Sequence, residues 1–206
     1  MDLNKVYIFR MTHVDNIEHI IENGLTHKNS LKSNPDYTPI GDSSLINTRD
    51  NLIIPNGSKL GEYIPFYFGF RTPMLYVVQN GYNGVKPTSP NNIIYCVSSV
   101  QKILDNNLNF FFTDGHATDN FSSFYSRTEI DNIEQLVDFE ATNAKFWKKQ
   151  DDLDFKRRKE ADFLIKEDLP SNLIIGYIVN IEESKNKLIE IGVPEKLVVV
   201  KPNYFF

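Results

Sequence analysis

Apolar and polar residues alternate along VYIFRMTH, residues 6–13. This period of two predicts a β-strand, with Tyr7, Phe9 and Met11 on one face and Arg10 on the other. Six later runs are rich in aromatic and β-branched residues, which is typical of strands. They are EYIPFYFGF, NIIYCVSSV, LNFFFTD, ADFLI, LIIGYIVNI and EKLVVVKPNYFF.

Helical spacing of apolar residues appears in three segments. In DNIEHIIENG, residues 15–24, we expect Asp15 to cap a helix, Glu18 to complete a capping box and Gly24 to end the helix. A longer helix is predicted over residues 128–147, and EESKNKLIEIG predicts a short one near the C-terminus. Strands and helices are mixed without strict alternation, which favours an α+β fold over a doubly wound sheet.

The length of the chain predicts one domain over residues 1–206, because this length fills one sizeable core and is too short for two. Residues 27–60 consist mostly of Asn, Ser, Pro, Asp and Gly. This composition predicts a long irregular stretch. Such loops in compact domains are either functional or disordered.

The composition argues against a membrane protein and against a disulfide-bonded protein. No apolar run approaches the roughly 20 residues of a membrane helix, and the N-terminal residues contain no apolar signal core. Cys96 is the only cysteine, so no intrachain disulfide can form, and its strand-like setting predicts a buried, unreactive thiol. We therefore expect a cytoplasmic protein without membrane contact. The lack of a long apolar helical seam predicts a monomer.

The formal net charge of −5 argues against nucleic-acid binding when it is taken alone. The average hides a local excess of positive charge. The segment from Lys145 to Lys159 contains five Lys and two Arg against three Asp. This excess fits either a solvated helix face or a surface that contacts phosphates.

Several common catalytic signatures are missing. His13, Asp15 and His19 lie close together, but the histidines do not have the i, i+4 spacing of a helical zinc pair and have no cysteine partner. We therefore predict no metal site. The chain also contains no Gly-x-Ser-x-Gly elbow, no Walker sequence and no Gly-x-Gly-x-x-Gly.

Two candidate sites lie in the first quarter of the chain. Residues 10–13, Arg-Met-Thr-His, stand where a strand passes into a helix. A helix N-terminus beside cationic side chains is a natural site for an anion or a nucleotide, although a simple cap beside an exposed arginine explains the same pattern. Arg49 lies in the long polar stretch, where it is either solvated or functional.

Two more candidates lie after the apolar run NFFF. Asp114 and His116 fall in the turn TDGH, which is explained either by turn chemistry or by a site. In the segment RRKEADFLI, Glu160 and Asp162 are two residues apart. On a strand they would project side by side, which marks either a solvated edge or a pair of carboxylates for acid–base chemistry.

The order of these segments carries a resemblance that none of them carries alone. YIFRMTHVDNIEHIIENGL, PIGDSSLINTR, GEYIPFYFGFRTPML, FFFTDGHA and KRRKEADFLI follow one another as in the DarT family of DNA ADP-ribosyltransferase toxins. The chain resembles this family from about Val6 to Phe206. The resemblance implies an ADP-ribosyltransferase-like fold, with two packed, mostly antiparallel sheets around an NAD cleft and flanking helices.

The resemblance also implies an activity. Such proteins cleave NAD at the bond between nicotinamide and ribose and attach ADP-ribose to a base of single-stranded DNA. FTDGHA and PIGDSSLINTR resemble the thymidine-modifying branch more than the guanosine-modifying branch. Residues 34–49 are then expected to cover the dinucleotide. The expected NAD-binding residues are Arg10, Met11, Thr12, His13, His19, Leu25 and Arg49.

In such proteins the counterpart of Arg49 holds the pyrophosphate or helps the target base to lose its proton. Residues 116–162 correspond to the substrate-reading loop and its following strand. This position favours DNA contacts for the basic segment, with aromatic side chains stacking on unpaired bases. The expected DNA-binding residues are His116, Phe124, Tyr125, Lys148, Lys149, Arg157 and Arg158.

ADP-ribosyltransferases commonly carry Gln/Glu-x-Glu on this strand, where the second acid stabilises the transition state and the first orients the target. Here Glu160 takes the first position and Asp162, shorter by one methylene, takes the second. Asp162 works on a shifted backbone, or Glu160 shares its role, or the chain is a weakened form. A catalytically inactive binder of NAD or DNA, and transfer to RNA or protein, remain alternatives.

The family resemblance implies a partner as well. Such toxins are typically encoded beside a macrodomain antitoxin that removes the modification.

Overall fold

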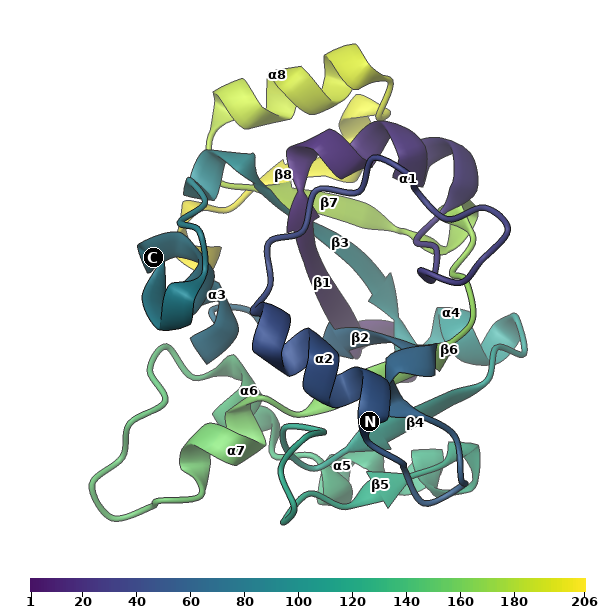
Figure 1. Cartoon of the computed structure of the whole chain (residues 1–206), viewed down its shortest axis with the longest axis vertical. Helices are drawn as coiled ribbons and strands as arrows, with labels where there is room; N and C mark the ends of the chain where they lie inside the picture. Colours follow the sequence, from purple (N-terminus) through teal and green to yellow (C-terminus); the bar gives the residue numbers. More distant parts are fainter.

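The computed structural model covers residues 1–206, and its strands form one eight-stranded sheet in the order β5-β4-β6-β2-β1-β3-β7-β8 (Figure 1). Neighbouring strands run antiparallel, except that β7 and β8 are parallel. The strands are β1 (Tyr7–His13), β2 (Tyr63–Tyr67), β3 (Ile93–Ser99), β4 (Phe110–Thr113), β5 (Phe124–Tyr125), β6 (Asp162–Lys166), β7 (Gly176–Val179) and β8 (Val198–Val200).

The α+β class is confirmed, but the strands do not form the two separate sheets that were expected. β1 pairs along its whole length with β3 on one side. On its other side it meets β2 at a single register pair, Phe9 opposite Tyr67. This short junction joins β5-β4-β6-β2 to β1-β3-β7-β8. The two halves therefore diverge beside β1 and leave room between them for a site.

Eight α-helices surround the sheet, and α1 lies beside α8 at one end (Figure 1). They are α1 (Ile17–Asn23), α2 (Ser43–Asn51), α3 (Pro73–Asn80), α4 (Val100–Asp105), α5 (Ile133–Leu136), α6 (Phe139–Asn143), α7 (Phe155–Lys159) and α8 (Glu182–Ile191). No helix has the length and apolar character that crossing a membrane requires.

The core covers both faces of the central strands. Ile8 belongs to the larger buried cluster, which includes residues of α1, α4 and α8. Phe9, the next residue, belongs to a second cluster with residues of α3 and the C-terminal segment. Cys96 is fully buried, and burial raises the pKa of its thiol to about 12, so it stays protonated at neutral pH.

The predicted start of the first helix is wrong, and its predicted end is confirmed. Asp15 is not the cap: His13 Nδ1 accepts a hydrogen bond from the Asp15 N–H, 3.3 Å away, and begins a 3-10 turn before α1. Gly24 ends α1 with a φ of +84°, and a Cβ there would lie 2.1 Å from the Leu169 carbonyl oxygen. Glycine is required at this close crossing.

The predicted helix over residues 128–147 is broken into short pieces. A 3-10 helix at Arg127–Asn132 leads into α5, and α6 begins only after Asp138. The Asp138 carboxylate accepts from the Ala141 N–H at 2.9 Å and so caps a new helix. Val137 is buried in an extended conformation between the two helices. Tertiary burial therefore overrides the helical period.

The polar stretch 27–60 is not wholly irregular, because it contains α2. The Asp42 carboxylate starts this helix by accepting from the Ser44 N–H at 2.8 Å. None of the α2 residues is fully buried, so the helix carries no apolar stripe that periodicity could detect. Arg49 lies in the last turn of α2 rather than in a loop.

Candidate active site

A cleft of about 510 Å³ opens between β1, β2, α1 and α2. This volume lies within the usual range for small-molecule sites. Of the expected NAD-binding residues, six line it: Arg10, Met11, Thr12, His19, Leu25 and Arg49. His13 does not line it, because its ring faces Asp15, with Nδ1 3.0 Å from Oδ2.

Arg49 gives this cleft an unsatisfied positive group. Its Nη2 atom is buried and has no hydrogen-bond partner. Burial lowers the pKa of the guanidinium, and the nearby Asp162 carboxylate acts in the opposite direction. A buried charged donor without a partner is costly. An anion bound in the cleft, such as a pyrophosphate, would supply the missing acceptor.

The second arginine of the cleft is already held in place. Arg10 projects from β1, and its Nη1 donates to the Pro65 carbonyl of β2 at 3.0 Å. This bond fixes the guanidinium at the narrow junction between the two halves of the sheet. Arg10 and Arg49 therefore place two positive charges in one cleft.

A polypeptide segment covers one side of the cleft. Residues between Thr26 and Ile46 line it, including Asn34 and Tyr37 of the expected covering loop. Thr38, near the start of this loop, is fixed by the buried Asn16, which contacts both of its backbone groups. Its Nδ2 donates to the carbonyl at 2.8 Å, and its Oδ1 accepts from the N–H at 2.8 Å.

The two acids do not project side by side from one strand, contrary to prediction. β6 begins at Asp162, whereas Glu160 caps the C-terminal end of α7. Asp162 is 1% exposed, and its Oδ2 accepts from the Ala117 N–H at 2.8 Å. Glu160 is 8% exposed. Burial raises the pKa of both carboxyl groups, and the nearby His116 opposes this shift at each of them.

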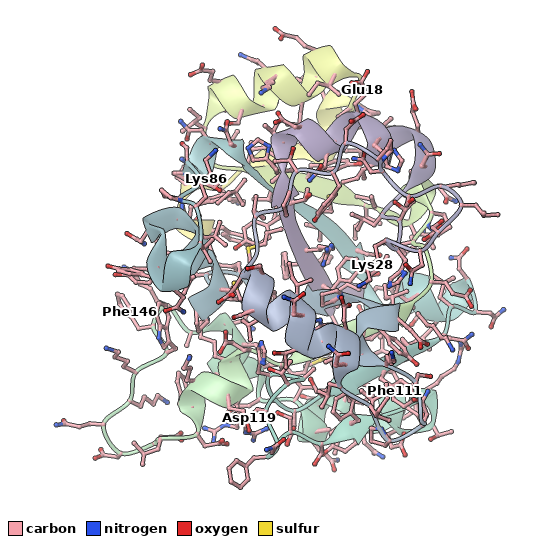
Figure 2. The ribbon with its side chains drawn as sticks, viewed as in Figure 1. Glu18, Lys28, Lys86, Phe111, Asp119 and Phe146 are labelled. Atoms are coloured by element: carbon pink, nitrogen blue, oxygen red, sulfur yellow. The ribbon has the colours of Figure 1, made fainter.

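A second cleft, of about 570 Å³, adjoins the first. Asp119, which lines it, is labelled in Figure 2. Glu160 also lines this cleft, while Leu45 and His116 line both clefts. Glu160 therefore lies in the second cleft, whereas Asp162 lies near His116 and Arg49 without lining either cleft. Two reactants bound in the two clefts would meet beside His116.

The structure separates the expected DNA-binding residues into free and engaged groups. Arg157 lines the second cleft, but it is bound to Asp114 at 3.0 Å and Asp154 at 2.6 Å. Arg158 forms ion pairs with Asp138 and Asp152. These ion pairs hold α7 against its neighbours and leave the two arginines with few donors for DNA phosphates. The surplus of positive charge read from the sequence is thus partly neutralised.

The lysines and aromatic residues divide in the same way. Lys148 is exposed without an ion pair, whereas Lys149 contacts Glu140 at 3.4 Å and lies over the Phe155 ring. Phe124 and Tyr125 form β5 and pack against buried residues. Both side chains are only partly buried and line neither cleft.

Phe121, one of the aromatic residues expected from the sequence to stack on unpaired bases, is 84% exposed in the second cleft. Two lining residues, Lys156 in the second cleft and Tyr67 in the first, were not singled out from the sequence. Tyr67 lines the first cleft, and burial raises the pKa of its phenol well above the usual value. The match of YIPFYFGFRTPML to the family signature could have identified Tyr67. No sequence pattern marks Lys156 out from its basic neighbours.

No three His, Cys, Asp or Glu side chains gather in a geometry that could hold a metal ion.

Comparison with known proteins gives consistent matches over the whole chain. The family model described as "ssDNA thymidine ADP-ribosyltransferase, DarT" matches residues 9–206. A DNA ADP-ribosyl transferase of Escherichia coli O127:H6 (strain E2348/69 / EPEC) is 33% identical over 187 residues, which cover 89% of this chain and 84% of that protein. A DNA ADP-ribosyl transferase-DNA ADP-ribosyl glycohydrolase fusion protein of Thermosipho africanus is 25% identical over 203 residues, which cover 97% of this chain and 49% of that protein.

Solved structures match equally well. DarT of Thermus sp. 2.9 in complex with ADP-ribosylated ssDNA is similar with a TM-score of 0.84 and 27% identity, covering 98% of this chain and 96% of that chain. The same protein in complex with NAD+ has a TM-score of 0.80, with 98% of both chains covered.

Proposed function

The chain belongs to the DarT family, whose model spans residues 9–206, and from this premise we propose that it transfers ADP-ribose from NAD to thymidine in single-stranded DNA. The observation that carries the proposal is the pair of adjoining clefts, with Arg49 in one, Glu160 in the other and His116 in both. Two clefts suit a reaction in which two substrates must meet.

NAD occupies the first cleft in this proposal, and Arg49 binds its pyrophosphate through the buried guanidinium that has no protein partner. A guanidinium pairs well with phosphate oxygens because its donors form a planar fork. Residues 34–49 cover the dinucleotide. The structure of the Thermus relative with NAD+ supports NAD as the ligand.

The reaction breaks the bond between ribose C1′ and the nicotinamide nitrogen, and nicotinamide leaves with the bonding electrons. A nitrogen of the base then forms the new bond to C1′, and the proton of this nitrogen passes to solvent water. Asp162 is proposed to stabilise the positive charge that develops on the ribose, because a fixed carboxylate in a buried site interacts strongly with such charge. Glu160 orients the base from the second cleft.

Single-stranded DNA follows the second cleft. Phe121 is well exposed there and offers a face on which an unpaired base can stack. Lys156 in the cleft and Lys148 on the adjacent loop contact phosphates. The complex of the Thermus relative with ADP-ribosylated ssDNA supports DNA as the acceptor rather than RNA or protein.

The proposal extends to the setting in which the enzyme acts. We propose a monomeric cytoplasmic toxin that acts beside an antitoxin able to remove the modification. The Thermosipho relative, which joins the transferase to a DNA ADP-ribosyl glycohydrolase in one chain, supports a partner of this kind.

A second candidate function is a weakened or inactive form that binds NAD and DNA. One observation favours it: Asp162 is 1% exposed, is bound to the Ala117 N–H and lines neither cleft. A side chain that is one methylene too short falls roughly 1.5 Å short of its target. A displacement near 1 Å can lower a rate by about 100-fold.

Mass spectrometry of oligonucleotides after incubation with NAD tests both candidates. The proposed enzyme adds one ADP-ribose to a thymidine-containing single strand and nothing to a matched strand in which every thymidine is replaced. Asp162→Glu should raise the rate by about 100-fold if reach limits the reaction. Transfer to neither strand by either form, with NAD still bound, would favour the binder. Modification of RNA or protein alone would exclude DNA as the acceptor.

A further inference from the structure

Asp168 lies in the turn after β6 and lines neither cleft. The preceding residue, Glu167, has a φ of +74°, a left-handed conformation that is uncommon for a residue other than glycine. We propose that Asp168 is a positioning residue for NAD, which holds the turn at residues 27–30 before the covering loop and, through that turn, the helix that carries Arg49. This inference rests on the proposed function.

The Asp168 carboxylate binds the first turn of the covering segment at two points. Oδ1 accepts from the His27 N–H at 2.7 Å, and Oδ2 accepts from the Ser30 hydroxyl at 2.5 Å. Immediately before this turn, Leu25 and Leu169 exchange backbone hydrogen bonds of 2.9 and 2.8 Å. The turn is therefore tied to the end of β6, the strand that begins at Asp162.

The same turn reaches the helix that carries Arg49. Lys28 forms an ion pair with Asp50, the residue after Arg49, and lies near α2 in Figure 2. The His27 ring contacts the Gly61 carbonyl. Gly61 packs so closely on α2 that a Cβ there would lie 2.8 Å from the Asp50 Cα. The turn thus links the end of β6 to α2, the helix that carries Arg49.

This arrangement bears on ligand binding because the turn itself lines the cleft. His27 and Lys28 are lining residues, as are Ser33 and Asn34 further along the loop. Asn16 holds Thr38, and Asp168 holds the turn at residues 27–30, so residues 27–38 are fixed at both ends before any ligand binds. A loop that is ordered in advance loses less conformational entropy on binding, which strengthens affinity.

The carboxylate is chemically suited to this role. Two donors converge on its two oxygens, and an ionised carboxylate accepts at both. Asparagine offers only one acceptor oxygen, and alanine offers none. Aspartate, asparagine and alanine at position 168 therefore offer the turn two, one and no acceptor oxygens.

Steady-state kinetics and calorimetry with NAD on the full chain test this inference. Asp168→Ala should raise KM and Kd for NAD about tenfold, which corresponds to about 1.4 kcal/mol, and leave KM for the oligonucleotide unchanged. Asp168→Asn should recover part of the loss. Glu167→Gln is the matched control, because it removes a neighbouring charge from the same turn, and it should bind NAD normally. Ser30→Ala removes one of the two bonds and serves if Asp168→Ala does not fold.

Unchanged Kd for NAD in a folded Asp168→Ala protein would overturn the inference. A lower kcat with equal increases in both KM values and a lowered melting temperature would also overturn it, because these changes would indicate general damage to the protein. Failure of the unaltered protein to bind NAD would overturn this inference and the proposed function together. NAD binding without transfer to DNA would refute the proposed transfer to DNA and leave this inference about NAD binding standing.

Discussion

At the residue scale, hydrogen-bond partners distinguish groups that can bind a ligand from groups that hold the fold. Arg157 and Arg158 share their donors among four aspartates, whereas Arg49 keeps a buried Nη2 without a partner. The sequence presents all three as arginines in polar surroundings. Only the placement of carboxylates around them separates their roles.

Replacement of Arg49 should have opposite effects on stability and on binding. Arg49→Ala removes a buried, unpaired donor, so we expect the free energy of unfolding of the ligand-free protein to rise by about 1 kcal/mol. We expect Kd for NAD to weaken about a hundredfold, the size that follows from losing charge-assisted hydrogen bonds to a phosphate. Chemical denaturation and calorimetry measure the two effects.

Arg127→Ala is the matched control. The Arg127 side chain donates to the Leu104 carbonyl at 3.0 Å and lines neither cleft. It should leave Kd for NAD unchanged. A stable Arg49→Ala protein that still binds NAD normally would remove Arg49 from the site.

At the element scale, short helices surround the site where the sequence pattern predicts an irregular stretch and one long helix. α2 forms inside a stretch that looks irregular, and one predicted helix breaks into three pieces. A buried lysine holds the broken region together. Lys159 is fully buried, and its Nζ donates to the carbonyls of Thr142 at 3.2 Å, Ala144 at 2.5 Å and Phe70 at 3.4 Å.

Loss of this lysine should loosen the segment between α6 and α7. Burial lowers the pKa of Lys159 to about 8. Lys159→Met leaves three carbonyl groups without their donor, and we expect it to lower the free energy of unfolding by about 3 kcal/mol. Hydrogen exchange should speed up at residues 139–154. Lys156→Met, the same change at an exposed lysine of α7, should leave stability unchanged. Equal stability of the two variants would show that the buried amine contributes little.

At the scale of the whole molecule, the narrow pairing of β1 with β2 lets the two halves of the sheet diverge beside the first cleft. The second cleft lies beyond it and involves α7 and residues 116–121. His116 and Leu45 are shared by both. This separation implies that changes on the far side of the second cleft affect one substrate without the other.

Phe121→Ala tests this separation. Its ring is exposed, so stability should not change, while loss of a stacking contact should raise KM for the oligonucleotide about tenfold. Kd for NAD should stay the same. Phe146→Ala is the matched control, because Phe146 is also an exposed loop phenylalanine but lines neither cleft. A weaker affinity for NAD in Phe121→Ala would contradict the assignment of the two clefts.

Sequence patterns alone identify seven of the eight strands, the end of α1 at Gly24, the family and six residues that line the first cleft, but they miss β5. Period-two patterns and a family signature are local properties of the sequence, so they can be recognised without knowledge of the fold. Three features are visible only in the tertiary structure: the strands form one sheet, Glu160 caps the end of α7, and Arg157 and Arg158 are paired with aspartates. These features depend on contacts between segments far apart in the chain, where burial and the positions of opposite charges outweigh local preference.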